Sequence, residues 1–513
     1  MTEQSPRRRR NSGRSRRTAG AIAQRPWRQV TYRYRPLELM SRDQIEQLHN
    51  TSLTILEEVG MKILSADARA TFREAGFDVS DSDDMVRFDR SGIEDLLAKA
   101  PGQFQLRARN PDRNVTIGGN KAVFTSVGGP AYCTDLEGGR RSGTYEEMCD
   151  FLRLVQSLNV IHQEGGGGFE PMDLPAETRH LDIAYAEITL TDKNWVPWTM
   201  GRSQSMDALN MAAISLETDL DGLVDNPVFS SIINTNSPLQ IDIPMADGLM
   251  TMARYGQAAV VTPFTLAGAM SPVTLAGALA QQHAEAMAGI ALTQIVRPGA
   301  PVVYGAFTSN VDMKTGSPAF GTPEYAQAAQ ASGQLARHIG VPFRSSNATT
   351  SHSSDAQAAY ESMMSLWGAM TGQAHMIKHA AGWLGGGLVA SFEKLIVDAE
   401  MLQMMAAYME PFEVDSAALA LDAVREVGPA GHFFGAEHTL ARYETAFNAP
   451  LVSSWENYES WVERGQDTAE KRASTVWKQL LADYEQPPLD PAVDEALRDY
   501  VARAKREGRK IQG

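Results

Sequence analysis

The sequence predicts an α/β fold of the TIM (β/α)8 barrel class, with an N-terminal helical and α+β cap and a C-terminal helical extension. Eight short apolar segments recur between about residues 120 and 390, and each is followed by small or polar residues. The stretches between them are long and rich in Ala, Met and Leu, which favours helices. An open doubly wound sheet is the main rival, but no glycine cluster has the phosphate-binding spacing of that class.

The chain is expected to have four parts. Residues 1–35 are expected to be a disordered basic tail, 36–118 an N-terminal helix and small α+β cap, 119–470 the barrel, and 471–513 a C-terminal helical extension. The tail holds eleven Arg and one acid, whereas the whole chain has a net charge of −15, so the body is acidic. We interpret the tail as a tether or solubility arm, with binding to RNA or to an acidic protein as the alternative.

The first helix is expected over residues 41–60. Ser41 is a suitable N-cap, apolar residues follow at helical spacing, and Gly60 is a stop signal. Short helical and alternating stretches between residues 64 and 115 then predict the small cap. The segments expected to provide the eight barrel strands are 121–129, 159–168, 195–200, 227–236, 258–268, 301–310, 341–350 and 385–391.

Composition and cysteine usage predict a cytoplasmic protein. No run of about 18 consecutive apolar residues occurs, so no membrane span is expected. Cys133 and Cys149 are too few for a disulfide framework and lack CxxC spacing. The arginine-rich N-terminus is not followed by the apolar segment of a signal peptide.

Motifs for acyl hydrolysis and for metal binding are missing from the sequence. GxSxG does not occur, and His375 and His379, four apart in a segment expected to be helical, lack the glutamate of HExxH. We therefore predict no metal bound by this chain. The glycines at 165–168 and 385–387 are expected to shape loops around a roomy pocket rather than to bind phosphate.

Aromatic residues near the expected strand ends are candidates for a pocket wall. Aromatic faces bind quaternary ammonium groups, although each such residue taken singly is more often part of a core. The candidates are Tyr132, Trp195, Trp198, Phe229, Phe264, Tyr304, Phe307 and Trp383.

The most distinctive segment is SNATTSHSSDAQAAYE, residues 346–361. A strand is expected to run into a polar loop that holds His352, and Asp355 is expected to cap the next helix. In a barrel this loop lies at the carboxyl end of a strand, so the imidazole of His352 would face the mouth. A solvent-exposed loop histidine is the alternative.

Most of the chain, from about residue 40 to 470, resembles the trimethylamine methyltransferase family. The most similar stretches are IEQLHNTSLTILEEVGMKI, INTNSPLQ, AGAMSPVTLAGALAQQHAEAMAGI, VYGAFTSNVDMKTGSPAFGTPEYAQ and GGGLVASFEKLIVDAEML. The resemblance implies a TIM barrel that demethylates a methylated amine. It further implies that the methyl group passes to a cobalamin-type corrinoid held by a separate partner protein, with none bound tightly by this chain.

The founding members of this family carry pyrrolysine in a segment similar to 346–361, and this chain has His352 at the corresponding position. That departure favours a quaternary amine such as glycine betaine over trimethylamine, because a quaternary nitrogen needs no further activation to leave as a neutral amine. A homo-oligomer is possible, and neither a nucleic acid nor a membrane is expected as a partner.

The resemblance also implies site residues. We expect catalytic roles for His352, Glu324 and Asp312, and substrate contacts from Trp195, Trp383, Tyr304, Phe307, Asn234, Asn236 and Ser271. The alternative is a barrel hydrolase or lyase that acts on a small polar substrate without corrinoid and uses Asp312, Glu324 and His352 as acids and bases.

Overall fold

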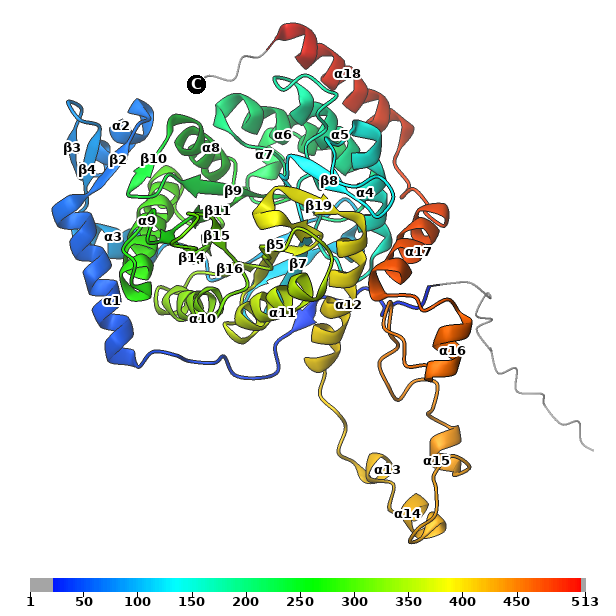
Figure 1. Ribbon diagram of the computed structural model, residues 1–513. Helices are drawn as coiled ribbons and strands as arrows, with labels where there is room; N and C mark the ends of the chain where they lie inside the picture. The colour runs from blue at the N-terminus through cyan, green and yellow to red at the C-terminus, as the bar shows by residue number, and fades with distance from the viewer. Residues whose placement is uncertain (1–21, 509–513) are drawn as a thin grey trace, which may run out of the picture.

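The centre of the molecule is a strongly curled, mostly parallel sheet (Figure 1). The structure is a computed structural model and describes residues 22–508. Six parallel strands follow one another around the sheet, in the order β7 (Lys121–Ser126), β17 (Met376–Ala381), β16 (Phe343–Ser346), β13 (Val302–Gly305), β11 (Ala258–Pro263) and β9 (Ser230–Thr235). The antiparallel strands β5 (Gln103–Leu106) and β6 (Val115–Gly118) continue the sheet beyond β7.

Single parallel bridges connect the two ends of this arc. Thr125 in β7 bridges Gln163, Gln163 bridges Asn194, and Trp195 bridges Phe229, next to β9. The second and third expected segments therefore contain isolated bridges, at Gln163 and at Trp195, and no strand with a full ladder.

The prediction of the eighth strand at residues 385–391 is wrong. Residues 385–391 form the 3₁₀ turn η3 (Gly385–Gly387) and β19 (Val389–Ser391), which pairs with β18 (Trp383–Leu384) and β8 (Tyr132–Thr134) in a small separate sheet. The eighth position in the curled sheet belongs to β17, in the segment expected to be helical. A strand that is buried on both faces lacks alternation, so a short apolar run does not distinguish it from a buried helix.

Helices cover the outside of the curled sheet (Figure 1). Asp355 caps its helix as predicted, because its side chain accepts a hydrogen bond from the backbone N–H of Ala358. The helices are α4 (Tyr145–Ser157), α5 (Arg179–Leu190), α6 (Gly201–Ser215), α7 (Leu220–Leu223), α8 (Ile243–Arg254), α9 (Leu275–Val296), α10 (Pro323–His338), α11 (Ala356–Thr371) and α12 (Phe392–Tyr408).

The N-terminal cap begins with α1 (Arg42–Thr54), which continues as the π-helix η1 (Ile55–Val59) and ends at Gly60. Ser41 caps α1 in a capping box with Gln44, as the sequence predicts. The rest of the cap comprises β2 (Met61–Ile63), α2 (Ala66–Glu74), β3 (Asp78–Ser80), β4 (Met85–Arg87), α3 (Arg90–Leu97) and the 3₁₀ turn η2 (Pro111–Arg113). The main domain adds β10 (Gln240–Ile241) to the sheet of the cap.

The boundary expected for the basic tail differs from the structure. Residues 1–21 lie outside the described residues, but β1 (Val30–Thr31) pairs antiparallel with β7. The buried Tyr32 donates a hydrogen bond to the carbonyl of Ala374. Composition suggests a solvated tail up to residue 35, but hydrogen bonds of Gln24 and Arg25 and the buried side chains of Val30 and Tyr32 hold this segment against the body.

Two helices of the C-terminal extension, α17 (Ala469–Ala482) and α18 (Pro491–Glu507), pack on the main domain. Between α12 and α17 the chain leaves the body, carrying the short helices α13 (Ser416–Leu419), α14 (Leu421–Val427), α15 (Glu437–Leu440) and α16 (Tyr458–Glu463) (Figure 1). Cys133 and Cys149 are both buried and free. Within residues 22–508, no helix has the length and apolarity to cross a bilayer.

Candidate functional site

A cavity of about 580 Å³ lies at the carboxyl ends of the parallel strands. Its walls come from residues within or just after β9, β11, β13, β16 and β17, and from the loops that follow Gln163 and Trp195. A second small sheet, of β12 (Leu266–Ala267), β14 (Ser309–Val311) and β15 (Pro318–Ala319), lies in the loops on this side. This is the end of a parallel α/β sheet at which ligands bind.

Aromatic rings form one wall of the cavity. The centres of the Phe264 and Phe307 rings are 5.3 Å apart, as are those of Phe307 and Phe320. Trp383 lies 6.1 Å from Phe307 and 6.2 Å from Phe320, and Trp198 also lines the space. Such rings present faces of negative potential, which attract a cation that carries methyl groups in place of hydrogen-bond donors.

Arg344 is the charged group of this wall. It lies in β16, is 2% exposed, and its guanidinium carbon is 5.2 Å from the centre of the Phe307 ring. One terminal nitrogen makes a long hydrogen bond of 3.4 Å to the carbonyl of Ala306, and Nε is buried without a partner among the described residues. Burial lowers the pKa of Arg344 to about 10, so it is cationic at neutral pH. A buried guanidinium with unused donors fits an anionic group of a ligand.

His379 faces the same cavity from a bulge in β17. The pairing of β17 with β7 shifts register between Ile377 and Ala381, and His379 has a φ of 52°. A bulge re-aims a side chain that regular alternation would direct elsewhere. The ring of His379 lies 4.5 Å from that of Trp383, and its Nδ1 is buried without a partner in the described chain. Burial and the nearby Arg344 hold the pKa of His379 well below its usual value, so the ring is neutral.

A polar layer lies beneath the cavity, inside the curled sheet. The Nζ of Lys378 donates to the Oε1 of Gln163 at 2.9 Å, and burial, with Arg344 as a further cause, lowers its pKa to about 7. Glu164 accepts hydrogen bonds from the backbone N–H groups of Gly166 and Gly167. Burial, with the neighbouring Glu164 as a further cause, raises the pKa of Glu187 well above its usual value, which favours the protonated form of Glu187.

Buried carboxylates fix the loops that carry the aromatic wall. Trp383 donates from Nε1 to the carbonyl of Thr349 at 3.1 Å, and Glu361 in α11 accepts from the backbone N–H groups of Thr350 and Ser351. Asp398 in α12 accepts from the N–H of Gly382 and forms a buried ion pair with Lys394. The position of Trp383 therefore depends on side chains from two of the outer helices.

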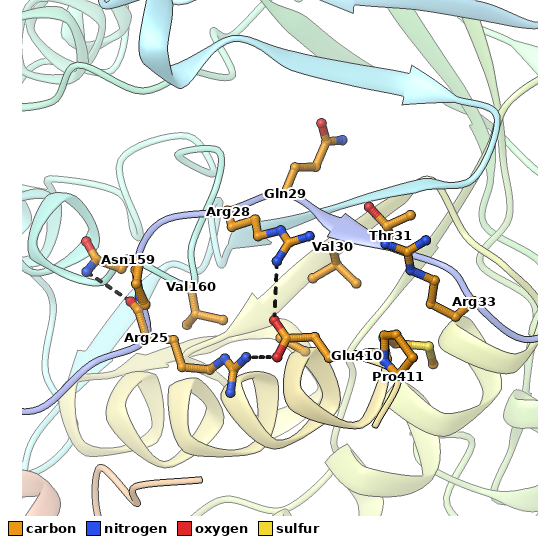
Figure 2. Close-up of a pocket in the computed structure, with 13 residues that line it drawn as sticks. Arg25, Arg28, Gln29, Val30, Thr31, Arg33, Asn159, Val160, Glu410 and Pro411 are labelled. Atoms are coloured by element: carbon orange, nitrogen blue, oxygen red, sulfur yellow. Dashed lines mark hydrogen bonds and ion pairs between the residues drawn. The ribbon is translucent and has the colours of Figure 1, made fainter. Parts of the chain in front are cut away.

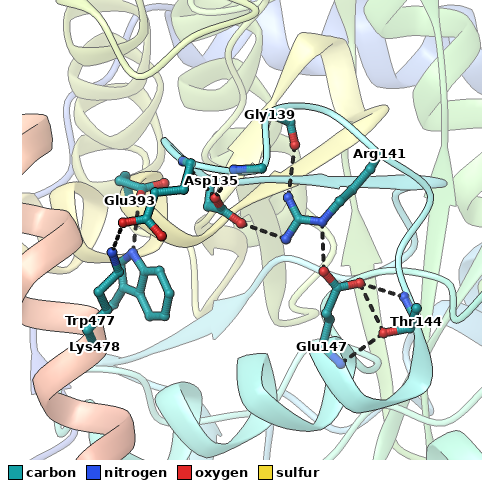
Figure 3. A network of polar contacts seen from close by, with 10 residues as sticks. Asp135, Gly139, Arg141, Thr144, Glu147, Glu393, Trp477 and Lys478 are labelled. Carbon is teal, nitrogen blue, oxygen red and sulfur yellow. Dashed lines mark hydrogen bonds and ion pairs between the residues drawn. The ribbon is translucent and has the colours of Figure 1, made fainter.

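A polar network next to the small β8–β19–β18 sheet supports the same region (Figure 3). Arg141 contacts Glu147 at 2.7 Å and Asp135 at 2.5 Å, which ties the loop after β8 to the first turn of α4. The indole of Trp477 donates to Glu393 at 2.9 Å and so joins α17 to the start of α12. The C-terminal extension thus fixes the start of α12, the helix that follows the cavity-lining residues Gly386 and Gly387 in the chain.

Four of the predicted substrate contacts line the cavity, namely Trp383, Phe307, Asn234 and Asn236. Three others do not. Trp195 packs against Phe229, with ring centres 5.3 Å apart, and Tyr304 points outward, where Gln282 and His283 contact its hydroxyl group. Ser271 lies in a loop outside the lining.

The three predicted catalytic residues also lie outside the cavity lining. His352 is exposed and lies beside Gly385, in the loop before α11. Asp312 is exposed in the turn between β14 and β15, where it accepts a hydrogen bond from Thr315. Glu324 is exposed in the first turn of α10. The structure does not bring these three together with the aromatic wall.

The prediction that His375 and His379 share a helical face is wrong, because both belong to the β17 region. His375 accepts the N–H of Phe343 and contacts the carbonyl of Gly119, so it is a structural residue, whereas His379 faces the cavity. Sequence reasoning also missed Arg344, Phe320 and Lys378. A usable signal was available for Arg344, because an arginine inside the apolar strand segment VPFRSS needs a functional or structural partner.

Comparisons with known proteins agree on one family. Residues 6–509 match the family model described as trimethylamine methyltransferase (MTTB). A glycine betaine methyltransferase of Desulfitobacterium hafniense (strain Y51) is 37% identical over 91% of this chain and 97% of its own length. A trimethylamine methyltransferase of D. hafniense (strain DSM 10664 / DCB-2) is 27% identical over 91% and 94%. One from Methanosarcina barkeri (strain Fusaro / DSM 804) is 24% identical over 91% and 95%.

Proposed function

The chain belongs to the trimethylamine methyltransferase family and is a methyltransferase, and we propose that it takes the methyl group from a betaine, a quaternary amine that carries a carboxylate. The observation that carries this proposal is the pairing of an aromatic wall with Arg344 in one cavity. Among the described residues that line this cavity there is no Asp or Glu. The cation of the substrate would therefore face rings, and its anion would face the guanidinium.

The cavity residues have separate tasks in this reaction. Phe307, Phe320 and Trp383 replace the water around the ammonium group, and Arg344 pairs with the carboxylate, so that one N-methyl group points to the mouth. The C–N bond breaks with its electron pair remaining on nitrogen, and a neutral tertiary amine is left. Aromatic faces hold this product less tightly than the cation, which favours its release.

The methyl acceptor would be a corrinoid carried by a partner protein, which supplies a strongly nucleophilic cobalt. The small residues of the cavity lining leave room for a large, flat group. Gly128, Gly129, Gly386 and Gly387 are among the residues that line the cavity, and a Cβ on Gly387 would lie 2.6 Å from the Trp383 ring. A side chain at Gly387 would therefore occupy space next to the Trp383 ring of the aromatic wall.

The full fold that we propose for the sheet is a (β/α)8 barrel. The isolated bridges at Gln163, Asn194 and Trp195 support it, because they supply two further strand positions between β7 and β9. A cytoplasmic location is also part of the proposal, supported by the two buried free thiols. Catalytic roles for His352, Asp312 and Glu324 stay predictions, and the position of His352 beside Gly385 supports a role at the mouth rather than inside the cavity.

The test is methyl transfer from single amines to free cob(I)alamin, followed by the change in visible absorbance. Glycine betaine should react, whereas choline and trimethylamine, which lack a carboxylate, should react far more slowly. His352→Ala should be measured in the same assay. Equal rates with glycine betaine and choline would contradict the role given to Arg344. Failure with every quaternary amine, even with a cognate corrinoid protein, would contradict the proposed function.

A further inference from the structure

Residues 411–450, which we call the arm, expose an apolar surface that the chain itself does not cover. Ten large apolar side chains of the arm are exposed, among them Phe412, Phe434 and Phe447 at 84–85%. The arm buries only two hydrophobic residues, Ala423 and Ala436. Its three helices have four, seven and four residues, and helices this short are not stable without a surface to pack on. The arm therefore needs a partner.

Both ends of the arm are fixed to the body. Glu410, just before it, pairs with Arg25 and Arg28, as Figure 2 shows. Just after it, Glu400 in α12 accepts the N–H of Val452 at 3.0 Å and the hydroxyl of Ser453 at 2.8 Å. The arm is thus held at two fixed points, and between them it extends from the body (Figure 1).

The body carries a second exposed apolar surface, on α11 and α12. Tyr360, Met364 and Trp367 follow one another on α11, and Met404 and Tyr408 on α12 are a turn apart; all five are exposed. The ring of Tyr408 lies 6.2 Å from Trp367 and 5.5 Å from Tyr34. We call these six residues the α11/α12 patch. A continuous aromatic surface of this kind on a folded domain marks an interaction site.

The two surfaces are complementary in charge. The arm holds six acids and two arginines. The segment 22–35, which contributes Tyr34 to the patch, holds four arginines and no acid. Three of these, Arg25, Arg28 and Arg33, line a cavity of about 430 Å³ at the base of the arm, and the side chain of Arg28 is 67% exposed (Figure 2). Arg25 and Arg28 already pair with Glu410, but Arg33 and Arg35 are exposed on either side of Tyr34. The acidic, apolar arm is therefore matched by an apolar patch with exposed arginines at its border.

We propose that the arm of one chain packs on the α11/α12 patch of a second copy, with the reciprocal contact made at the same time. Complementary surfaces on one chain allow a twofold exchange in which each contact is formed twice. Five arm aromatics alone would bury on the order of 500–1,000 Å² per copy, and two arms then reach the area of a stable interface. A corrinoid protein is a poorer occupant, because the base of the arm lies beside β1, at the start of β7, whereas the cavity lies at the other end of the strands.

The experiment is the mass of the full chain in solution, measured by sedimentation equilibrium over a concentration series. The wild type should be a dimer or a larger assembly of dimers. Phe434→Ser with Phe447→Ser in the arm, and Trp367→Ser in the patch, should each raise the dimer dissociation constant at least about tenfold, the effect of about 1.4 kcal/mol. Val59→Ser, at an apolar residue of η1 that is 53% exposed and lies outside both surfaces, is the control and should change nothing.

Mixing the arm variant with the patch variant distinguishes exchange between copies from contacts within one chain. The mixture contains one intact arm and one intact patch, so it should form a heterodimer more tightly than either variant forms a homodimer. Unchanged methyl transfer and circular dichroism would establish that each variant is folded. A monomeric wild type, variants with unaltered dimers, or an arm that binds only after a corrinoid protein is added would each overturn the proposal.

Discussion

The guanidinium of Arg344 lies 5.2 Å from the centre of the Phe307 ring, and both residues line the cavity at the carboxyl ends of the strands. A cation that is already stacked on the aromatic wall keeps its other donors free for a ligand. It also excludes a second cation from that side of the wall. With the proposed betaine as substrate, the ammonium group would be directed toward the Trp383 side, and the carboxylate toward Arg344.

Arg344→Gln should lower kcat/KM for glycine betaine by about 30- to 1,000-fold, which corresponds to about 2–4 kcal/mol for losing a buried charge partner. The rate with choline, which should already be low in the wild type, should stay the same or rise in this variant. Choline has no carboxylate that could pair with Arg344. Steady-state rates with both amines check this prediction. A parallel loss with both would indicate a damaged fold.

Trp383→Leu should weaken binding of a quaternary ammonium ligand by about 1–2 kcal/mol, roughly five- to thirtyfold, because it removes an aromatic face from the cavity. Titration with tetramethylammonium, measured by calorimetry, tests it. Trp383→Phe should restore part of the affinity.

Trp195→Leu is the matched control for that substitution. Trp195 packs on Phe229 outside the lining, so its loss should lower the free energy of unfolding and leave ammonium affinity unchanged. If ammonium affinity falls equally in the Trp195 variant, the aromatic wall has been assigned to the wrong residues.

Asp398→Ala should destabilise the protein by about 3–5 kcal/mol, because it leaves Lys394 charged and unpaired in the interior. Lys394→Met combined with Asp398→Leu should cost less than the single change, since both charges are removed together. Urea unfolding of the two variants makes the comparison. A larger loss of unfolding free energy in the double variant than in the single variant would contradict this prediction. It would show that the attraction between the two charges exceeds the free-energy cost of burying them.

Stability should fall as the pH drops from about 6.5 toward 4. The Nδ1 of His49 in α1 forms a hydrogen bond of 2.9 Å with the Nε2 of His283 in α9. Burial lowers the pKa of His49 from 6.5 to about 4. Between these two values the unfolded chain binds a proton that the folded chain does not, so stability rises with pH across this window.

The measurement is the urea midpoint at pH 4.5 and at pH 7, for the wild type and for His49→Gln. Glutamine keeps hydrogen-bonding capacity but does not titrate, so the variant should lose part of the pH dependence. An identical pH dependence in the two proteins would assign the effect to other groups, such as His162, whose pKa burial also lowers to about 4.

Local signals in the sequence predicted much of the fold. Ser41 and Asp355 cap helices because capping depends on a few neighbouring residues, and five of the expected strand segments contain a strand of the curled sheet. The segment around β17 was misassigned because its strand is buried on both faces and the spacing of two histidines imitates a helix.

The site was predictable only in part. Phe307, Trp383, Asn234 and Asn236 end up in the lining because each lies near the carboxyl end of a strand, which sequence position reveals. Whether a residue within a strand points inward or outward depends on register, so Tyr304 was included and Arg344 was missed. The direction of the His379 side chain depends on a bulge in β17, and no local pattern in the sequence predicts that bulge.

The position of β1 also means that this strand is synthesised long before the residues that it contacts. Tyr32 bonds to Ala374, and Arg25 pairs with Glu410, so the first described residues of the chain contact residues more than 340 positions later. A ribosome that adds 5–20 residues per second needs about 20–80 s to make these partners after the N-terminal segment has emerged. During that time the segment waits as an unpaired strand, and its arginines oppose pairing with other nascent chains.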